Sequence, residues 1–83
     1  MKDKLTLYIE YYSNGNIFIK GQRNSKAQEE ELWEEFYENG NIRWRVSLNR
    51  DKKDGIEEEF DEQGNITKTR VWKDGELIET TKH

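Results

Sequence analysis

One short pattern occurs three times in the chain and constrains its fold more than any other feature. An aromatic residue is followed four positions later by glycine, and the glycine by Asn-Ile, in residues 11–17, 36–42 and 60–66. The three glycines are 25 and 24 residues apart. Gly and Asn tolerate the positive φ that tight hairpin turns require. Each copy therefore predicts a β-hairpin.

A second turn signal, Asp-Gly, occurs at Asp54-Gly55 and Asp74-Gly75. Together the two signals predict an all-β fold: an elongated antiparallel β-meander of about seven strands, built from three hairpin repeats of 24–25 residues. We expect residues 1–83 to form a single repeat domain, with units at approximately 5–31, 32–55 and 56–80.

The turn type predicts how the strands pair. If residues 13–15 form a three-residue turn with a glycine bulge, Tyr11 faces Ile17 and Ile9 faces Ile19. In the second unit the same rule puts Leu32 opposite Val46 on an apolar face and Glu35 opposite Arg43 on the other face. A two-residue turn at Asp74-Gly75 places Trp72 against Leu77, Lys73 against Glu76 and Arg70 against Glu79.

One segment has an alternative. Ser25 is a candidate helix N-cap, and acidic residues follow it through Glu35. The apolar residues of this segment do not form a helical stripe, and residues 32–37 align with the strand expected at 56–61. We therefore predict a loop at 23–28 and a strand thereafter, with a helix packed on the sheet as the alternative.

The stretch from Gly55 to Ile66, followed by Val71 to Leu77, resembles the bacterial variant of the MORN repeat, and the first two units repeat the resemblance more briefly. Ile56 and Glu76 depart from it, because the repeat has Lys after its second turn. The resemblance implies an elongated antiparallel sheet. Bacterial members of this group are similar to antitoxin components of toxin-antitoxin systems, and others are repeat scaffolds.

The composition argues against catalysis. There is no cysteine, the single histidine is His83, and Ser13, Ser25 and Ser47 have no other histidine to act as base. The glycines are dispersed and do not form a phosphate-binding loop. A pair of carboxylates remains possible, but a thin sheet lacks the deep cleft that would raise a pKa. We expect no enzyme activity, no catalytic residue, no cofactor and no metal site.

Charge is unevenly distributed along the chain. Residues 1–28 carry a net charge of +3, residues 29–62 carry −8, and residues 63–83 carry +1. A negative field repels phosphate and anionic lipid and attracts a basic partner. We therefore expect no direct nucleic-acid or membrane binding. The alternative is that the acidic run only keeps the protein soluble.

Aromatic residues on the less apolar face are a second indication of binding, unless they only cover that face. The leading hypothesis is a non-catalytic inhibitor of the antitoxin, immunity or anti-CRISPR type. It would mask the basic nucleic-acid-binding surface of a toxin nuclease or CRISPR-type effector, and the alternative is a structural repeat scaffold. The residues expected to contact the partner are Trp33, Glu35, Tyr37, Glu57, Glu58, Glu59, Asp61 and Glu62.

Two further expectations concern assembly and location. Edge strands near residues 5–12 and 76–80 could pair two copies into a homodimer, and Lys2, Lys4 and Lys82 would oppose such pairing. The apolar runs are too short for a membrane span, and the first four residues do not resemble a signal peptide. We therefore expect a cytoplasmic protein.

Overall fold

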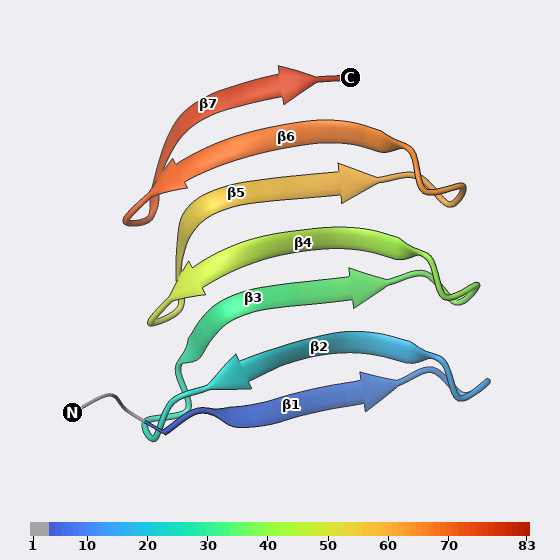
Figure 1. The fold of residues 1–83 in the computed structure, drawn as a ribbon, viewed down its shortest axis with the longest axis horizontal. Coiled ribbons are helices and arrows are strands. Elements are labelled where there is room, and N and C mark those ends of the chain that lie inside the picture. Colours follow the sequence, from blue (N-terminus) through green and yellow to red (C-terminus); the bar gives the residue numbers. More distant parts are fainter. Residues whose placement is uncertain (1–3) are drawn as a thin grey trace.

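The computed structural model describes residues 4–83, which form seven antiparallel strands in one sheet with strand order β1 to β7 (Figure 1). This confirms the predicted all-β meander. Lys2 lies outside the described residues. The strands are β1 (Thr6–Tyr11), β2 (Ile17–Arg23), β3 (Glu29–Phe36), β4 (Ile42–Asn49), β5 (Lys52–Phe60), β6 (Ile66–Lys73) and β7 (Glu76–Lys82).

The Gly-Asn-Ile pattern forms the three turns at one end of the sheet, as predicted (Figure 1). In the first turn the Tyr12 N–H donates to the Asn16 carbonyl at 2.8 Å, and the Gly15 N–H donates to the Tyr12 carbonyl at 3.0 Å. The same two bonds recur in the second and third turns. Gly15 has φ of 91°, Gly40 has 92° and Gly64 has 90°, which explains why glycine occupies this position. We call this end of the sheet the turn edge.

The segment that could have been helical is a loop followed by a strand. The Asn24 carboxamide oxygen accepts hydrogen bonds from the N–H groups of Lys26 and Gln28, which closes the loop, and β3 begins at Glu29. The alternative of a helix packed on the sheet is therefore wrong, and the prediction of a loop and then a strand is confirmed.

The predicted register is correct beside each turn and wrong beyond it. Tyr11 pairs with Ile17 as expected, but Ile9 pairs with Lys20, because Phe18 is an extra residue in a β-bulge. The second hairpin has the same shift, so Ser47 and not Val46 lies opposite Leu32.

The last hairpin also starts in the predicted register and then shifts. Trp72 pairs with Leu77 and Lys73 with Glu76, but Arg70 pairs with Thr80 and not with Glu79. One bulged residue reverses the face to which all following side chains point. The shift in register therefore decides which residues are buried.

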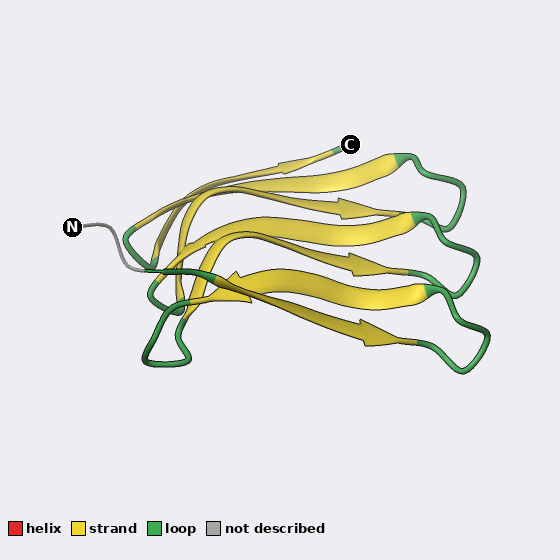
Figure 2. Cartoon of the chain, turned by 60° about the horizontal axis from the view of Figure 1, so that its bottom comes forward, coloured by secondary structure: helices red, strands yellow, loops and turns green. Residues whose placement is uncertain are grey.

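The buried core lies on one face of a single, bent layer. Trp33 is 1% exposed and lies opposite Val46, which is 0% exposed, while Leu32 is 46% exposed. Leu48 completes the core. The sheet measures 41 × 34 × 14 Å, and Figure 2 shows its strands bending sharply near the end away from the turn edge. We call the face that carries Trp33 the inner face and the opposite one the outer face.

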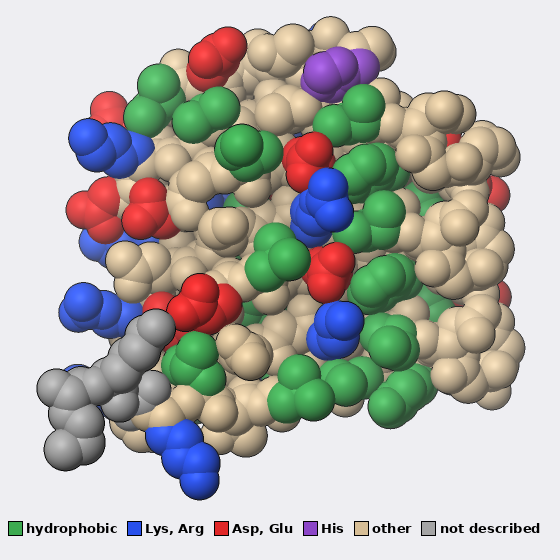
Figure 3. Space-filling model, viewed as in Figure 1, with side chains coloured by type: hydrophobic (Ala, Val, Ile, Leu, Met, Phe, Trp, Pro, Cys, Tyr) green, Lys and Arg blue, Asp and Glu red, His purple; other side chains and the backbone are tan. Residues whose placement is uncertain are grey.

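The outer face, seen in Figure 3, carries a row of charges that crosses four strands. The register aligns Lys20, Glu34, Arg45 and Glu58. Lys20 and Glu34 form an ion pair at 3.7 Å, and Arg45 and Glu58 form one at 2.7 Å. Figure 3 shows alternating acidic and basic side chains down the middle of this face, with hydrophobic side chains beside them. The row is internally neutral.

Candidate functional site

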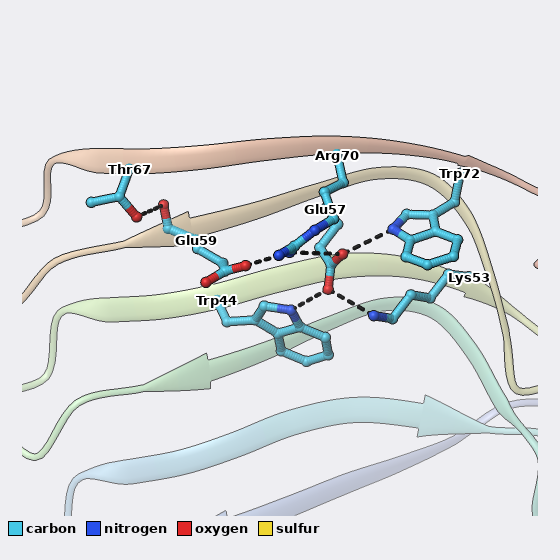
Figure 4. Close-up of polar contacts among 7 residues, drawn as sticks. All are labelled: Trp44, Lys53, Glu57, Glu59, Thr67, Arg70 and Trp72. Atoms are coloured by element: carbon cyan, nitrogen blue, oxygen red, sulfur yellow. Dashed lines mark hydrogen bonds and ion pairs between the residues drawn. The ribbon is translucent and has the colours of Figure 1, made fainter. Parts of the chain in front are cut away.

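A buried carboxylate organises the inner face of the second half of the sheet. Glu57 is 2% exposed, and four donors from three strands converge on it (Figure 4). The indole N–H groups of Trp44 and Trp72 donate to its two oxygens at 2.6 and 2.8 Å. The Lys53 ammonium lies at 2.9 Å and the Arg70 guanidinium at 3.4 Å from it. All four donors come from β4, β5 and β6.

These donors keep Glu57 ionised. Burial raises the pKa of the Glu57 carboxyl, but the hydrogen bonds from Trp44, Lys53 and Trp72 outweigh burial and hold that pKa below its usual value. Arg70 also forms an ion pair with Glu59, which raises the pKa of the guanidinium. The cluster is therefore closed on itself, and Glu57 presents no oxygen to a partner.

A different set of contacts joins the repeats at the turn edge. The Tyr12 hydroxyl donates to the Phe36 carbonyl at 2.6 Å, and the Tyr37 hydroxyl donates to the Phe60 carbonyl at 2.7 Å. Two asparagines of each turn also donate to one carbonyl of the next turn: Asn14 and Asn16 to Glu38, and Asn39 and Asn41 to Glu62, all within 2.7–3.0 Å. Each unit thus holds the unit that follows it.

The third turn ends this series. Asp61 stands where the first two turns have tyrosine, and Gln63 stands where they have asparagine. The Asp61 carboxylate accepts the N–H groups of Asn65 and Gln63 within its own turn. The hydrogen bond from the Asn65 backbone is the main cause that holds the pKa of Asp61 below its usual range. The third unit therefore has no tyrosine hydroxyl to reach forward.

Two neighbouring depressions open at the turn edge. One, of about 490 Å³, is lined by the carboxylates Glu35, Glu59 and Asp61 together with Tyr37 and Trp44. The other, of about 570 Å³, is lined by Glu38 and Glu62 beside Tyr12 and Tyr37. Arg43 is the one basic residue lining them, and it pairs with Glu35 at 3.5 Å. We call the five carboxylates and two tyrosines that line these depressions the acidic edge: Tyr12, Glu35, Tyr37, Glu38, Glu59, Asp61 and Glu62.

The structure separates the eight residues expected to bind a partner. Glu35, Tyr37, Glu59, Asp61 and Glu62 all belong to the acidic edge. The other three lie elsewhere, because Glu58 is paired on the outer face, and Trp33 and Glu57 are buried. The expectation that Trp33 and Glu57 are at the surface is wrong. The bulged residues of β4 and β6 shift the register, so that Trp33 lies opposite the buried Val46 and Glu57 lies opposite Arg70.

The sequence analysis did not find the roles of Trp44 and Trp72. A signal was present in the repeat: Glu57 follows Trp33 by 24 residues and so occupies the same, buried position of the next unit. A buried carboxylate requires donors, and the tryptophans on the neighbouring strands are the nearest indole donors.

Two searches for other kinds of site found nothing in residues 4–83. No three His, Asp or Glu side chains of this range could hold a metal ion together. Within the same range, no helix is long and apolar enough to cross a membrane.

Comparison with known families agrees with the repeat geometry. The MORN repeat variant family matches residues 6–24, 32–43 and 53–74, which is more than half of the chain. The chain belongs to this family. Each matched segment of this MORN repeat protein contains part or all of one hairpin. No curated protein and no solved structure matches the chain.

Proposed function

We propose that this MORN repeat protein is a non-catalytic binding module that holds a basic segment of a partner protein against the acidic edge. The observation that carries the proposal is the charge of that edge: five carboxylates line the two depressions, against the single guanidinium of Arg43. Glu35 pairs with Arg43 and Glu59 pairs with Arg70, so the excess negative charge comes from Glu38, Asp61 and Glu62. In the row on the outer face and in the Glu57 cluster, by contrast, the charges are matched.

The shape of the acidic edge supports the same proposal. The depressions are shallow and lie side by side, sharing Tyr37 and Arg43. Tyr37 is fixed by its hydrogen bond to the Phe60 carbonyl, so a bound chain would meet an aromatic ring that is already ordered. Lys and Arg side chains fit such a surface because their stems cover rings while their charged heads reach carboxylates.

In its finer form the proposal is an inhibitor of the antitoxin, immunity or anti-CRISPR type. A basic surface that binds nucleic acid would be neutralised when the acidic edge covers it, because the carboxylates compete with phosphates for the same cations. A cytoplasmic location goes with this function. The alternative, a repeat scaffold, is favoured by the contacts that join each unit to the next.

The proposal is tested with a fluorescent peptide rich in Lys and Arg, titrated with the protein at low and at high salt. The double variant Glu38→Gln/Glu62→Gln removes two charges of the acidic edge and keeps the backbone carbonyls that accept the asparagines. We expect it to weaken binding by about threefold to thirtyfold at low salt. The control Glu76→Gln/Glu79→Gln removes two exposed charges on β7 and should bind like the wild type.

Equal affinity of the two double variants would overturn the placement of the site. The finer form has its own readout, which is release of the same peptide from labelled duplex DNA on addition of the protein. Binding without release would exclude the inhibitor. A repeat scaffold that does not use the acidic edge would keep its function in Glu38→Gln/Glu62→Gln, while Gly40→Val would abolish folding, since φ of 92° at Gly40 excludes valine.

A further inference from the structure

The two edges of the sheet are chemically different. At the β1 edge Leu7 is 61% and Tyr11 is 62% exposed, and Glu10 is the one charged residue of the strand. The β7 edge carries Glu76, Glu79 and Lys82. In the described part of the chain, no segment lies beyond β1 (Figure 1). Soluble proteins commonly protect edge strands with charges, and β1 has almost none.

We propose that two copies of this chain pair through their β1 strands, antiparallel, in a closed dimer whose two sheets form one continuous sheet. The proposal does not depend on the proposed function, because β1 takes no part in the acidic edge. An antiparallel neighbour is what β1 already has on its other side in β2, so the added strand continues the same ladder.

The sequence of β1 selects the register. A two-fold axis normal to the sheet must pass midway between one residue of β1 and the same residue of the partner. Outer-face residues then meet outer-face residues. With the axis at Ile9, Leu7 faces the partner's Tyr11, and Tyr8 faces the partner's Glu10. This register pairs the two most exposed apolar residues of β1 with each other and brings no like charges together. An axis at Glu10 would oppose two carboxylates.

The chemistry of the β7 edge favours a closed assembly over a fibre. Head-to-tail stacking would pair β7 of one copy with β1 of the next, because β7 is the strand at the far edge of the sheet. Glu76, Glu79 and Lys82 of β7 would then be brought against the apolar residues of β1, which is unfavourable for their charges. Pairing of β1 with its own copy avoids this cost.

The chain contains no cysteine, so a single introduced cysteine reports the register directly. Ile9→Cys is expected to form a disulfide-linked dimer under mild oxidation, because the two side chains meet at the axis. Leu7→Cys and Tyr11→Cys are expected to cross-link mainly when the two variants are mixed. Ile78→Cys, on the β7 edge and 59% exposed in the wild type, is the control and should cross-link slowly.

Sedimentation equilibrium of the unmodified protein measures the dimer itself. We expect concentration-dependent association to twice 10.0 kDa. Ile9→Lys should raise the dissociation constant at least about fivefold, because like charges then face each other at the axis. Mixing Ile9→Lys with Ile9→Glu should restore association, and circular dichroism of each variant checks that it folds.

Three results would overturn the proposal. They are a monomer at every concentration, cross-linking of Ile78→Cys as fast as that of Ile9→Cys, and no recovery on mixing the two charged variants. A monomer would indicate that the β1 edge serves a different protein or a further strand, and not a second copy.

Discussion

Trp33 and Glu57 occupy the same position in successive repeats and are buried by opposite means. Each lies in the long first strand of its unit, pairs with Val46 of β4, and is almost fully covered, at 1% and 2% exposure. Trp33 is buried in an apolar cluster with Val46 and Leu48, against which Tyr8 and Ile19 also pack. Glu57 is buried by two indole N–H groups, an ammonium and a guanidinium.

The difference shows that burial in this fold is set by position in the repeat and not by residue type. The neighbouring strands adapt to whichever residue is there. On the strand before Trp33, Gly21 of β2 leaves room for the indole. On the strand after, Val46 faces Trp33, whereas Arg70 faces Glu57. The first half of the sheet thus has an apolar core and the second half a polar one.

The largest expected effect comes from removing the charge of Glu57. Glu57→Gln replaces one acceptor oxygen by an amide group that cannot accept the donors around it. We expect a loss of about 2–4 kcal/mol in the free energy of unfolding. The matched control is Glu58→Gln, one residue away and paired with Arg45 on the outer face, which should lose at most about 1 kcal/mol. Equal losses in urea unfolding would contradict the polar-core account.

A comparable test of the apolar half is Gly21→Ala. A Cβ at this position would lie 2.1 Å from Cδ2 of the Trp33 ring, so the ring must move. We expect a loss of about 1–3 kcal/mol. In a Trp33→Leu background the same substitution should cost much less, because the ring is absent. If a thermal-unfolding double-mutant cycle gives additive effects, the close approach of Trp33 to Gly21 does not limit packing.

Single donors of the Glu57 cluster should matter less than the carboxylate itself. Trp44→Phe and Trp72→Phe each keep an aromatic ring and remove one indole N–H bond. We expect each to cost about 1 kcal/mol beyond any loss of packing. In a Glu57→Gln background both costs should shrink, and urea unfolding of the four variants measures this. Unchanged costs would mean that the indoles contribute through packing alone.

The smallest effect concerns pH. The pKa of Glu57 is lower in the folded protein than its usual value, so its stabilisation is complete above the unfolded pKa of about 4.3 and is lost as pH falls through the folded pKa. The difference in unfolding free energy between wild type and Glu57→Gln should therefore be constant near neutral pH and shrink in acid. Denaturant titrations from pH 7 to pH 3 measure it, and a difference that grows in acid would show that Glu57 is protonated when folded.

The sequence was sufficient for the strands and the Asn-Gly turns and insufficient for the faces. The turn predicted at Asp54-Gly55 is wrong, because both residues lie inside β5 and the turn before it is formed by Arg50 and Asp51, which have φ of 49° and 69°. The glycine turns fix the hairpins, and Tyr11–Ile17, Phe36–Ile42 and Phe60–Ile66 pair as the turns require. The bulged residues that follow are Phe18, Arg43 and Thr67, which share no chemical property that would mark them. Each one reverses the inside and outside of the strand beyond it.

The same bulges explain what could be predicted of the acidic edge. Glu35, Tyr37, Glu59, Asp61 and Glu62 lie in or beside the turns, where the local pattern fixes their place. Trp33 and Glu57 lie on the far side of the bulges, where the expected face is reversed. The contacts between units, such as Tyr37 to Phe60, are formed 23 residues apart and have no local signal.

The most direct test of the central claim is the ¹³C chemical shift of the Glu57 side-chain carboxyl, followed from pH 7 down to pH 2.5. We expect the pKa of Glu57 to lie below the usual glutamate value, because two indoles and two cations stabilise its charge. A pKa above the usual value would mean that burial outweighs these donors, and it would contradict the polar core of the second half of the sheet.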